Sequence, residues 1–453
     1  MNIIQTFVQL QQAFVITGQR FTCVERANAE YTVQPSGYTA RAGDVTFSNG
    51  LIGELQIKGT ANLLCFGMSA TASGAVNAQA IIDALSRAGR LYIPKGTYDV
   101  ETPLNIPNSE IIIEGDGRDA TKINLVNTTG LGIFFKSVFP NRGQKIQLRD
   151  FSIRSNVQRE NSFNLAFYAT DILDIQRITV ADCFSGILLS GCSNVNMNSV
   201  KVFKGANTAT LQGVGISLIR DAEYSISPIT NCLFQVDVEA KSSNAEAFDA
   251  GFLINASDGI WLTDCHSYLS NDGILISGAS NYQIGRTTIE NCYLDLSYNT
   301  NLHFTGATTG KFFNIEINST LLRAAGASSV LAEDSCSLQE VSFNNCRFEA
   351  AGLRPLDLST TNGLDRLAIT NCKFYGNNTT SLASSIGCDI KALNFIYTGN
   401  VNATTFAGDS DLIIRGGSNN ILVTGNSFSS SANTSNITDN SGAVTKLITN
   451  NLL

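Results

Sequence analysis

Paired carboxylates are the first candidates for chemistry in this sequence. Asp295 and Glu349 could serve as the acid and base of a glycosidase, in which one carboxyl group protonates the leaving oxygen and the other activates water. Asp237 and Glu239, in the stretch FQVDVEA, are the alternative pair. Aromatic rings and guanidinium groups, which suit the binding of sugars, accompany them. The candidates for substrate binding are Tyr268, Tyr293, Arg323, Arg347, His266, Tyr375 and the single tryptophan, Trp261.

A repeated hexad determines where these side chains lie. The stretch IENCYL (289–294) recurs as ITNCLF (229–234), LTDCHS (262–267), FNNCRF (343–348) and ITNCKF (369–374). With less regular copies included, the fourth position of the hexad falls at 151, 178, 200, 232, 265, 292, 320, 346, 372, 400 and 426. Intervals of 22 to 33 residues between short apolar segments with Gly and Asn turns are typical of a β-solenoid.

The hexad also predicts the geometry of one rung. Its first, fourth and sixth residues are apolar or small and should point inward, while the Asn, Asp, Ser or Gly at the third position turns the chain. Asp264 is therefore expected to be a turn residue. Cysteine fits a tight interior column because it is small and hydrophobic, and Asn400 and Asn426 would continue that column as a hydrogen-bonding ladder. Eleven rungs would form a rod of roughly 50 Å.

The cysteines themselves are not expected to bind metal. The chain has eleven of them but no C-x-x-C motif, and only two histidines. Cys265 and His266 are adjacent, so on a strand they point to opposite faces. Adjacent-rung pairs such as Cys265 and Cys292, or Cys346 and Cys372, would lie within disulfide reach. Free buried thiols are nevertheless predicted, because nothing in the sequence indicates an oxidising compartment.

Stacking the rungs brings the candidate residues onto one outward surface. The position after the cysteine collects His266, Tyr293 and Arg347, and the position two further on collects Tyr268, Asp295, Arg323, Glu349 and Tyr375. Asp295 and Glu349 would then lie two rungs apart, roughly 10 Å, with Arg323 between them. This composition is typical of a glycan-binding groove. A loop at 242–251, which carries Glu246 and Asp249, could overhang it.

Structural alternatives remain open for several of these residues. The Asp-Arg-Glu column could be a salt-bridge ladder between rungs, or it could be buried between the subunits of a trimer. His266 is expected to form a wall of the groove. Trp261 could cap an apolar end of the rung or provide a platform for a sugar ring.

The overall composition excludes some classes of partner. The chain is 43% hydrophobic and only 15% charged, with a formal charge of −8, which argues against binding to nucleic acid. No run of eighteen apolar residues predicts a transmembrane helix, and the first twenty residues lack the basic start of a signal peptide. A weakly charged partner such as carbohydrate fits better.

Two segments resemble a known superfamily. The stretches NAQAIIDALSRAGRLYIPKGTYDV (77–100) and SEIIIEGDGRDATKINL (109–125) resemble the capping helix and first rungs of pectate-lyase-like right-handed parallel β-helices. Residues 1–60 resemble the small module that precedes such helices in bacteriophage tailspikes and tail fibres. We therefore expect an all-β, right-handed, single-stranded parallel β-helix of about eleven rungs with a small N-terminal β module and a short capping helix. The expected divisions are 1–60, 61–110 (linker, capping helix and entry strand), 111–430 (β-helix) and 431–453 (C-terminal cap).

The resemblance implies a protein of the phage tail that binds bacterial surface polysaccharide as a homotrimer, attached to the virion through residues 1–60. The catalytic motifs of the superfamily are absent from this sequence. The stretch before the helix, which is often acidic in that superfamily, reads FGMSATASGAVN here. Only Asp272 in SNDGILISG (270–278) is similar to the acidic cluster of polygalacturonases. Three functions stay open: a hydrolase that needs no cofactor, a non-catalytic adhesin or structural tail component, and a calcium-dependent lyase that uses Arg323 or Arg347.

Overall fold

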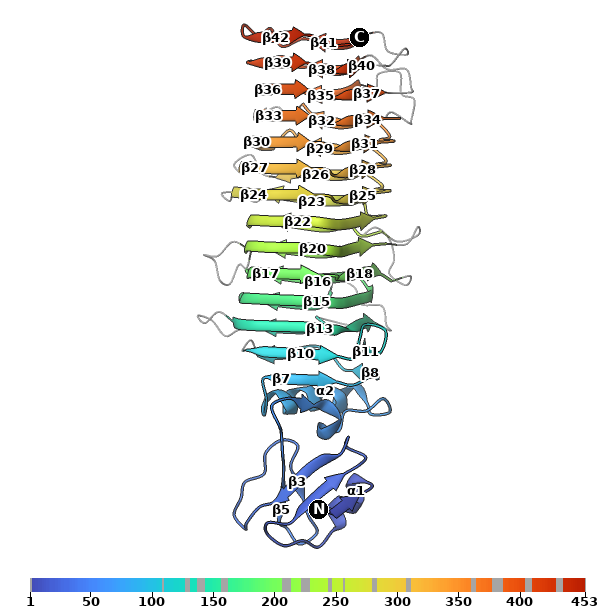
Figure 1. The fold of residues 1–453 in the computed structure, drawn as a ribbon, viewed down its shortest axis with the longest axis vertical. Coiled ribbons are helices and arrows are strands. Elements are labelled where there is room, and N and C mark those ends of the chain that lie inside the picture. The colour runs from blue at the N-terminus through green and yellow to red at the C-terminus, as the bar shows by residue number, and fades with distance from the viewer. Residues whose placement is uncertain are drawn as a thin grey trace.

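The computed structural model describes residues 2–107, 110–126, 131–136, 143–155, 162–205, 213–220, 229–242, 247–255, 257–278, 283–306, 311–359, 364–376, 386–403, 410–428 and 435–452. A small module at one end of a long rod contains a five-stranded sheet in the order β1-β2-β3-β5-β4 (Figure 1). Its elements are β1 (Asn2–Ile4), α1 (Phe7–Gln12), β2 (Arg20–Cys23), β3 (Ala29–Val33), β4 (Val45–Thr46) and β5 (Ile52–Leu55). The sheet lies within the predicted 1–60 module.

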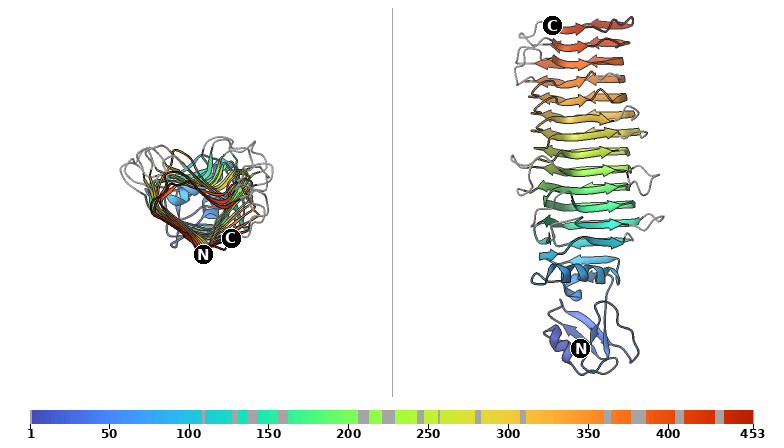
Figure 2. Two further views of the ribbon diagram at one scale, coloured as in Figure 1. Left: turned by 90° about the horizontal axis from the view of Figure 1, so that it is seen from above. Right: turned by 180° about the vertical axis from the view of Figure 1, so that it is seen from behind.

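The rod is a right-handed parallel β-helix, as predicted. Its coils superimpose when they are seen along the long axis, and they enclose one continuous apolar core (Figure 2). Every strand pairing from β6 to β42 among the described residues is parallel, because each coil places its strands beside those of the next. We distinguish three faces, named A, B and C in chain order within a coil.

Faces A and B belong to one 24-stranded sheet and are separated by a bend. Face A contains β7 (Arg90–Ile93), β10 (Ile111–Gly115), β17 (Ser193–Asn198), β24 (Gln283–Glu290), β27 (Lys311–Asn318), β30 (Ser337–Asn344), β33 (Leu364–Thr370), β36 (Ala392–Thr398), β39 (Ile421–Thr424) and β42 (Lys446–Thr449). Face B contains β8 (Gly96–Val100), β11 (Thr121–Leu125), β18 (Lys201–Lys204), β25 (Tyr293–Asp295), β28 (Leu321–Arg323), β31 (Arg347–Glu349), β34 (Lys373–Tyr375), β37 (Val401–Ala403) and β40 (Ser427–Phe428). Four long strands run through both faces: β13 (Gly143–Ser155), β15 (Thr170–Cys183), β20 (Ile229–Lys241) and β22 (Ser257–Tyr268).

Face C is a separate sheet of 13 strands among the described residues. These are β9 (Leu104–Pro107), β12 (Ile133–Lys136), β14 (Phe163–Tyr168), β16 (Ser185–Ser190), β19 (Val214–Ile219), β21 (Ala250–Asn255), β23 (Asp272–Gly278), β26 (Thr300–Gly306), β29 (Val330–Ala332), β32 (Leu356–Leu358), β35 (Ile386–Ile390), β38 (Ser410–Ile414) and β41 (Ser435–Asp439). Among the described residues the helix therefore has thirteen coils with a face C strand, two more than the eleven predicted, and β42 begins a further coil on face A. β41 and β42 pair in register with β38 and β39, so the β-helix continues past residue 430, where a separate cap was expected.

The bend between faces A and B lies at the third position of the hexad. Asp264, Asn291, Ser319, Asn345 and Asn371 have φ between 48° and 55°, the left-handed conformation that Asn and Asp tolerate best. Gly399 and Gly425 take the same place with φ of 67°. Asp264 is thus a turn residue, as expected.

One member of the predicted series is wrong. Cys232 pairs with Val195 and Ile260, which lie five residues before the column on their own strands, and Val238, six residues after Cys232, takes the place beside Cys265. The bend of that coil is at Asp237, with φ of 56°. The sequence ITNC at 229–232 lies within the straight part of β20. It was mistaken for a bend because the same residue types fit a straight strand as well as they fit the turn.

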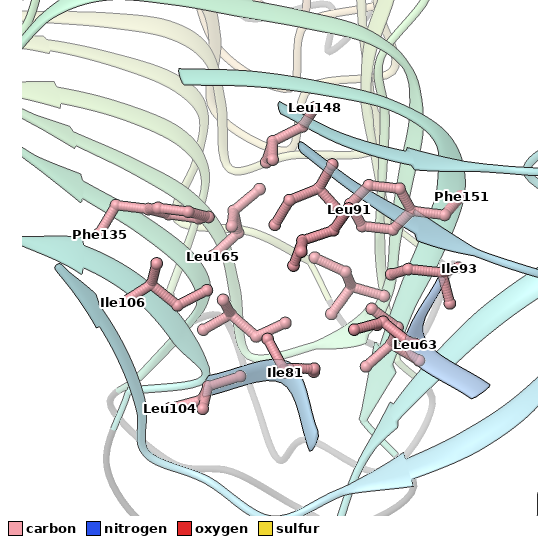
Figure 3. Close-up of a pocket in the computed structure, with 14 residues that line it drawn as sticks. Leu63, Ile81, Leu91, Ile93, Leu104, Ile106, Phe135, Leu148, Phe151 and Leu165 are labelled. Carbon is pink, nitrogen blue, oxygen red and sulfur yellow. The ribbon is translucent and has the colours of Figure 1, made fainter. Parts of the chain in front are cut away.

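The N-terminal end of the β-helix is closed by β6 (Ala61–Asn62), the 3₁₀ helix η1 (Leu63–Phe66) and α2 (Gly74–Leu85). Ser73 caps α2 through its side chain, and Ile81 points into the end of the core. A cavity of about 20 Å³ remains there, lined only by apolar side chains such as Leu63, Ile81 and Leu91 (Figure 3). This volume is close to one water and offers it no polar partner, so the cavity is a packing gap at the cap.

The eleven cysteines are free thiols, and all except Cys65 are buried. Burial raises the pKa of the Cys183 thiol to about 12 and that of Cys65 to about 11. We expect the native protein at pH 8 to react with a thiol reagent at Cys65 alone, slowly, and the unfolded protein to react at all eleven without reductant. Fewer than eleven reactive thiols after unfolding would reveal a disulfide in the interior column.

Candidate functional site

The strand register places most of the predicted binding residues on the outer side of face B. His266, Tyr293, Leu321, Arg347 and Lys373 form one column. The second column contains Lys241, Tyr268, Asp295, Arg323, Glu349 and Tyr375. Sequence analysis predicted these columns from His266 and Tyr268 onward, because face B begins one residue after the cysteine and no variable loop intervenes. It expected Gln235 where Lys241 pairs with Tyr268, as a result of the error at Cys232.

Within these columns, Tyr293, Asp295, Arg323, Arg347 and Glu349 form a connected group that we call the face B ladder. The Arg323 guanidinium lies 3.8 Å from Oδ2 of Asp295 and 4.0 Å from Oε2 of Glu349. Tyr293 donates a hydrogen bond of 2.6 Å to Oδ2 of Asp295 and accepts one of 3.3 Å from Arg323. Arg347 is paired with Glu349. The salt-bridge alternative raised by the sequence therefore describes the observed contacts.

The geometry of this ladder suits binding better than acid-base chemistry. An inverting pair of carboxylates needs a water molecule between them, and here the Arg323 guanidinium occupies that space. The hydrogen bond with Tyr293 and the charge of Asp295 raise the pKa of Arg323 above its usual range, which opposes the role of a lyase base. Burial and the bond to Asp295 likewise raise the pKa of Tyr293. Arg323 and Arg347 remain 52% and 57% exposed, so their guanidinium groups can reach a ligand.

The remaining aromatic residues of face B are partly engaged. His266 packs edge-on against Tyr293, with ring centres 6.1 Å apart. The Lys241 ammonium lies 5.2 Å from the Tyr268 ring, and the Arg347 guanidinium 5.4 Å from the Tyr375 ring. These contacts fix the rings at the surface without burying them.

The structure does not bring the other predicted residues to this ladder. Asp237 is exposed at the bend between faces A and B, and Glu239 is paired with Lys201 at 3.2 Å beside His266. Trp261 lies in the middle of face A, between Leu233 and Thr288, with 37% of its surface exposed. It neither caps the end of a rung nor lines face B. Glu246, on the predicted overhanging loop, lies outside the described residues, whereas Asp249 is described and lies next to face C.

Face C carries a group of charged residues that sequence analysis did not assemble. Four successive coils contribute Asp249, Asp272, His303 and Glu333, which we call the face C row, and Lys204, at the end of β18 on face B, is close enough for its charge to act on Asp249. Lys204 is buried, and its ammonium lies 5.2 Å and 5.3 Å from the rings of Phe184 and Phe248. Asp272 and His303 are buried as well, and they bond at 2.8 Å through Oδ2 and Nδ1.

The only sequence signals for this row were Asp272 in SNDGILISG and Asp249 in the 242–251 loop. Asp249, Asp272, His303 and Glu333 follow the bend column by 11, 7, 11 and 13 residues, counted from Val238, Cys265, Cys292 and Thr320. Because these intervals differ, alignment on the cysteine does not place the four residues together.

Two classes of site find no support in the described part of the chain. No group of three or more His, Cys, Asp or Glu side chains there could hold a metal ion. None of the helices described is long and apolar enough to cross a membrane.

Comparison with known proteins agrees with the fold. No protein-family model and no curated protein sequence matches the chain. Among solved structures, the mannuronan C-5 epimerase AlgE6 A-module of Azotobacter vinelandii is 13% identical and covers 86% of this chain and 98% of its own, with a TM-score of 0.55. The gp42 tailspike of Acinetobacter phage vb_AbaP_AS12 is 12% identical and covers 98% of this chain and 73% of its own, with a TM-score of 0.51. Several other phage tailspikes match at lower TM-scores. The chain thus has a tailspike-like parallel β-helix fold, which it shares with a polysaccharide epimerase.

Proposed function

We propose that this protein is a tailspike-type receptor-binding protein whose face B binds a bacterial surface polysaccharide, either capsule or O-antigen. The observation that carries the proposal is the face B ladder, where two half-exposed arginines alternate with tyrosines and carboxylates on successive coils. Guanidinium groups bond hydroxyl or carboxylate oxygens of a glycan, and tyrosine rings provide flat apolar surface beside them. A repeat of about 4.8 Å along the rod suits a long polymer.

Attachment to the phage tail through residues 1–60 and assembly as a homotrimer complete the proposal. Both rest on the resemblance of the N-terminal module and on the tailspike-like fold. Arg87, which follows α2, donates hydrogen bonds to Asp44, Ala42 and Leu55 of the module, so the module is anchored to the capped end of the rod.

Cleavage of the bound glycan by Asp295 and Glu349 is the hypothesis that the sequence raised. Arg323 lies between them and Asp295 is buried, which favours a structural role in which these carboxylates hold Arg323 and Tyr293 in place. The adhesin alternative needs nothing more from face B. A lyase that uses Arg323 or Arg347 as its base is disfavoured, since both guanidinium groups are paired with carboxylates.

Arg323→Ala is expected to weaken binding to the cognate polysaccharide about tenfold, which corresponds to about 1.4 kcal/mol. The measurement is binding of the full chain to an array of purified capsule and O-antigen polysaccharides. Arg286→Ala is the matched control, because Arg286 is similarly exposed and paired with Asp258 at 2.7 Å, but on face A. If both variants bound the polysaccharide as tightly as the wild-type protein does, face B would not be the binding surface.

A further inference from the structure

The outer side of face A carries a groove that is separate from the face B ladder. Its volume is about 430 Å³, within the range of roughly 300–1,000 Å³ that is usual for ligand pockets. The groove crosses β27, β30, β33 and β36, which stack in successive coils, and it reaches Asn420 just before β39 (Figure 1). We call it the face A groove. It runs between two columns of outward side chains, over the backbone of the buried residues that separate them.

Small side chains in one of these columns give the groove its depth. Glu316, Ser342, Ala368 and Ile396 occupy the same position on the four strands. Ser342 and Ala368 fill little of the space between the longer side chains at the two ends of the column. Glu316 and Ile396 are three coil spacings apart, roughly 14 Å. The groove therefore has a carboxylate at one end and an apolar side chain, 41% exposed, at the other.

The second column forms the side of the groove. It contains Asn314, Glu340, Arg366, Asn394 and Asn420. The Arg366 side chain is 60% exposed, and its guanidinium is paired with Glu340 at 3.4 Å. Asn420 donates a hydrogen bond of 2.8 Å to Asn394. This side of the groove thus presents polar groups whose positions are fixed by their neighbours.

Polar groups in the groove are available to a ligand. Glu316 is exposed, and its carboxylate has no hydrogen bond or ion pair with the residues that the structure describes. The same holds within the described chain for the Ser342 hydroxyl. Arg366 has five N–H groups, and its pairing with Glu340 leaves most of them open. The groove can therefore both accept and donate hydrogen bonds.

The charges of the groove favour an uncharged ligand. Two carboxylates, on Glu316 and Glu340, outnumber the one guanidinium of Arg366, so an acidic sugar would be repelled. Sugar hydroxyls can donate to the Glu316 carboxylate and accept from Arg366. The apolar C–H side of a sugar ring would contact Ala368 and Ile396. A neutral sugar fits this combination, whereas the exposed arginines of face B also suit an acidic one.

Trp261 continues the column of Glu316 beyond the end of the groove. It is in register with Thr288, which is in register with Glu316, so the tryptophan lies two coils, roughly 10 Å, from Glu316. Its exposed ring is a flat apolar surface of the kind that contacts sugars. Arg286, which lies beside Thr288, is held by both oxygens of Asp258 at 2.9 Å and 2.7 Å. Arg286 therefore offers little to a ligand on this column.

We propose that the face A groove is a second glycan-binding site, which takes a neutral sugar of the polysaccharide, with Trp261 as a platform for an adjoining part of the same chain. The inference rests on the proposed function, because the ligand is the polysaccharide that the protein binds. It does not rest on face B, since the two sites share no residue. Two sites that engage one long polymer raise its overall affinity above that of either site.

Ala368→Phe is the decisive variant, because the phenyl ring would fill the groove. Ala368 points outward and is partly exposed, so the core of the coil is left intact. The affinity of the full chain for the polysaccharides that it binds on the array should fall by about tenfold or more. Thr424→Phe, at a partly exposed outward position of face A outside the groove, is the matched control and should bind as the wild-type protein does.

Glu316→Ala tests the free carboxylate. Loss of hydrogen bonds to a charged acceptor should weaken binding about tenfold. Glu290→Ala, which removes an exposed carboxylate of face A outside the groove, should leave the affinity unchanged. Wild-type affinity in Glu316→Ala would contradict the assigned role of this carboxylate and overturn the proposed site.

The fluorescence of Trp261 reports on face A alone, because it is the single tryptophan of the chain. Neutral oligosaccharides released from the bound polysaccharides should change its emission in the wild-type protein and in Arg323→Ala, but not in Ala368→Phe. Oligosaccharides that contain uronic or sialic acid should require at least about tenfold higher concentrations. Equal potency of acidic and neutral oligosaccharides would overturn the assigned ligand class.

The outcomes distinguish this inference from the proposed function. Binding to no capsule or O-antigen polysaccharide overturns both. Wild-type affinity in Ala368→Phe, together with weaker binding by Arg323→Ala, overturns the inference alone. The reverse result supports the face A groove and overturns face B as the binding surface. A changed oligomeric state of Ala368→Phe, measured by light scattering, would mean that face A is a contact between subunits, and the inference would be wrong.

Discussion

Asp389→Ala is expected to lower the free energy of unfolding by about 3 kcal/mol, the lower end of the range for breaking a buried ion pair. Asp389 has no exposed surface, and its two oxygens accept from Arg415 at 2.6 Å and 2.5 Å and from Arg354 at 3.0 Å. The lower end applies because Arg415 and Arg354 stay 41% and 26% exposed, so water can partly solvate them once the carboxylate is removed.

Denaturant unfolding checks this value, with Asp357→Ala as the control. Asp357 pairs with the same Arg354 at 2.8 Å but is partly exposed, so its loss should cost less than about 1 kcal/mol. Similar losses in both variants would mean that burial of Asp389 adds nothing to the strength of its ion pairs.

Asn426→Leu is expected to have a comparable effect through hydrogen bonds in the core. Oδ1 of Asn426 accepts from the backbone of Asn400 at 2.9 Å, and its amide donates to the Tyr397 carbonyl at 2.9 Å. Leucine fills a similar volume but leaves these buried groups without partners, at about 1 to 3 kcal/mol each. The expected loss is therefore about 3 kcal/mol, measured by denaturant unfolding.

Thr320→Val tests whether the loss comes from unpaired polar groups. Thr320 lies in the same interior column and accepts from the Cys292 amide at only 3.3 Å. Its replacement by an isosteric apolar residue should cost about 1 kcal/mol. If Thr320→Val were as damaging as Asn426→Leu, disturbed packing of the column would explain both results.

The error at Cys232 shows that a local sequence pattern does not by itself decide where the chain bends. The hexads ITNCLF and ITNCKF share five of six residues, yet Asn371 bends the chain and Asn231 does not. Cys232 and Phe234 are buried just as Cys372 and Phe374 are, so the local sequence fits a bend or a straight strand. Pairing with β17 and β22 decides between them, because it places Cys232 beside Val195 and Ile260.

What the sequence determined by itself is the repeat, the left-handed bend, the interior column from cysteine to asparagine and the neighbouring columns of face B. Each follows from residues within a few positions of the bend, where covalent geometry fixes the register. What only the tertiary structure decided is the face C row and the choice among the alternatives for the Asp295–Arg323–Glu349 column, where the salt-bridge ladder is the one that forms. The segment that leads from the bend to face C varies in length from coil to coil, so its residues acquire a common register only when the strands of adjacent coils form hydrogen bonds. A contact such as His303 with Asp272 joins residues 31 positions apart and exists only after that pairing.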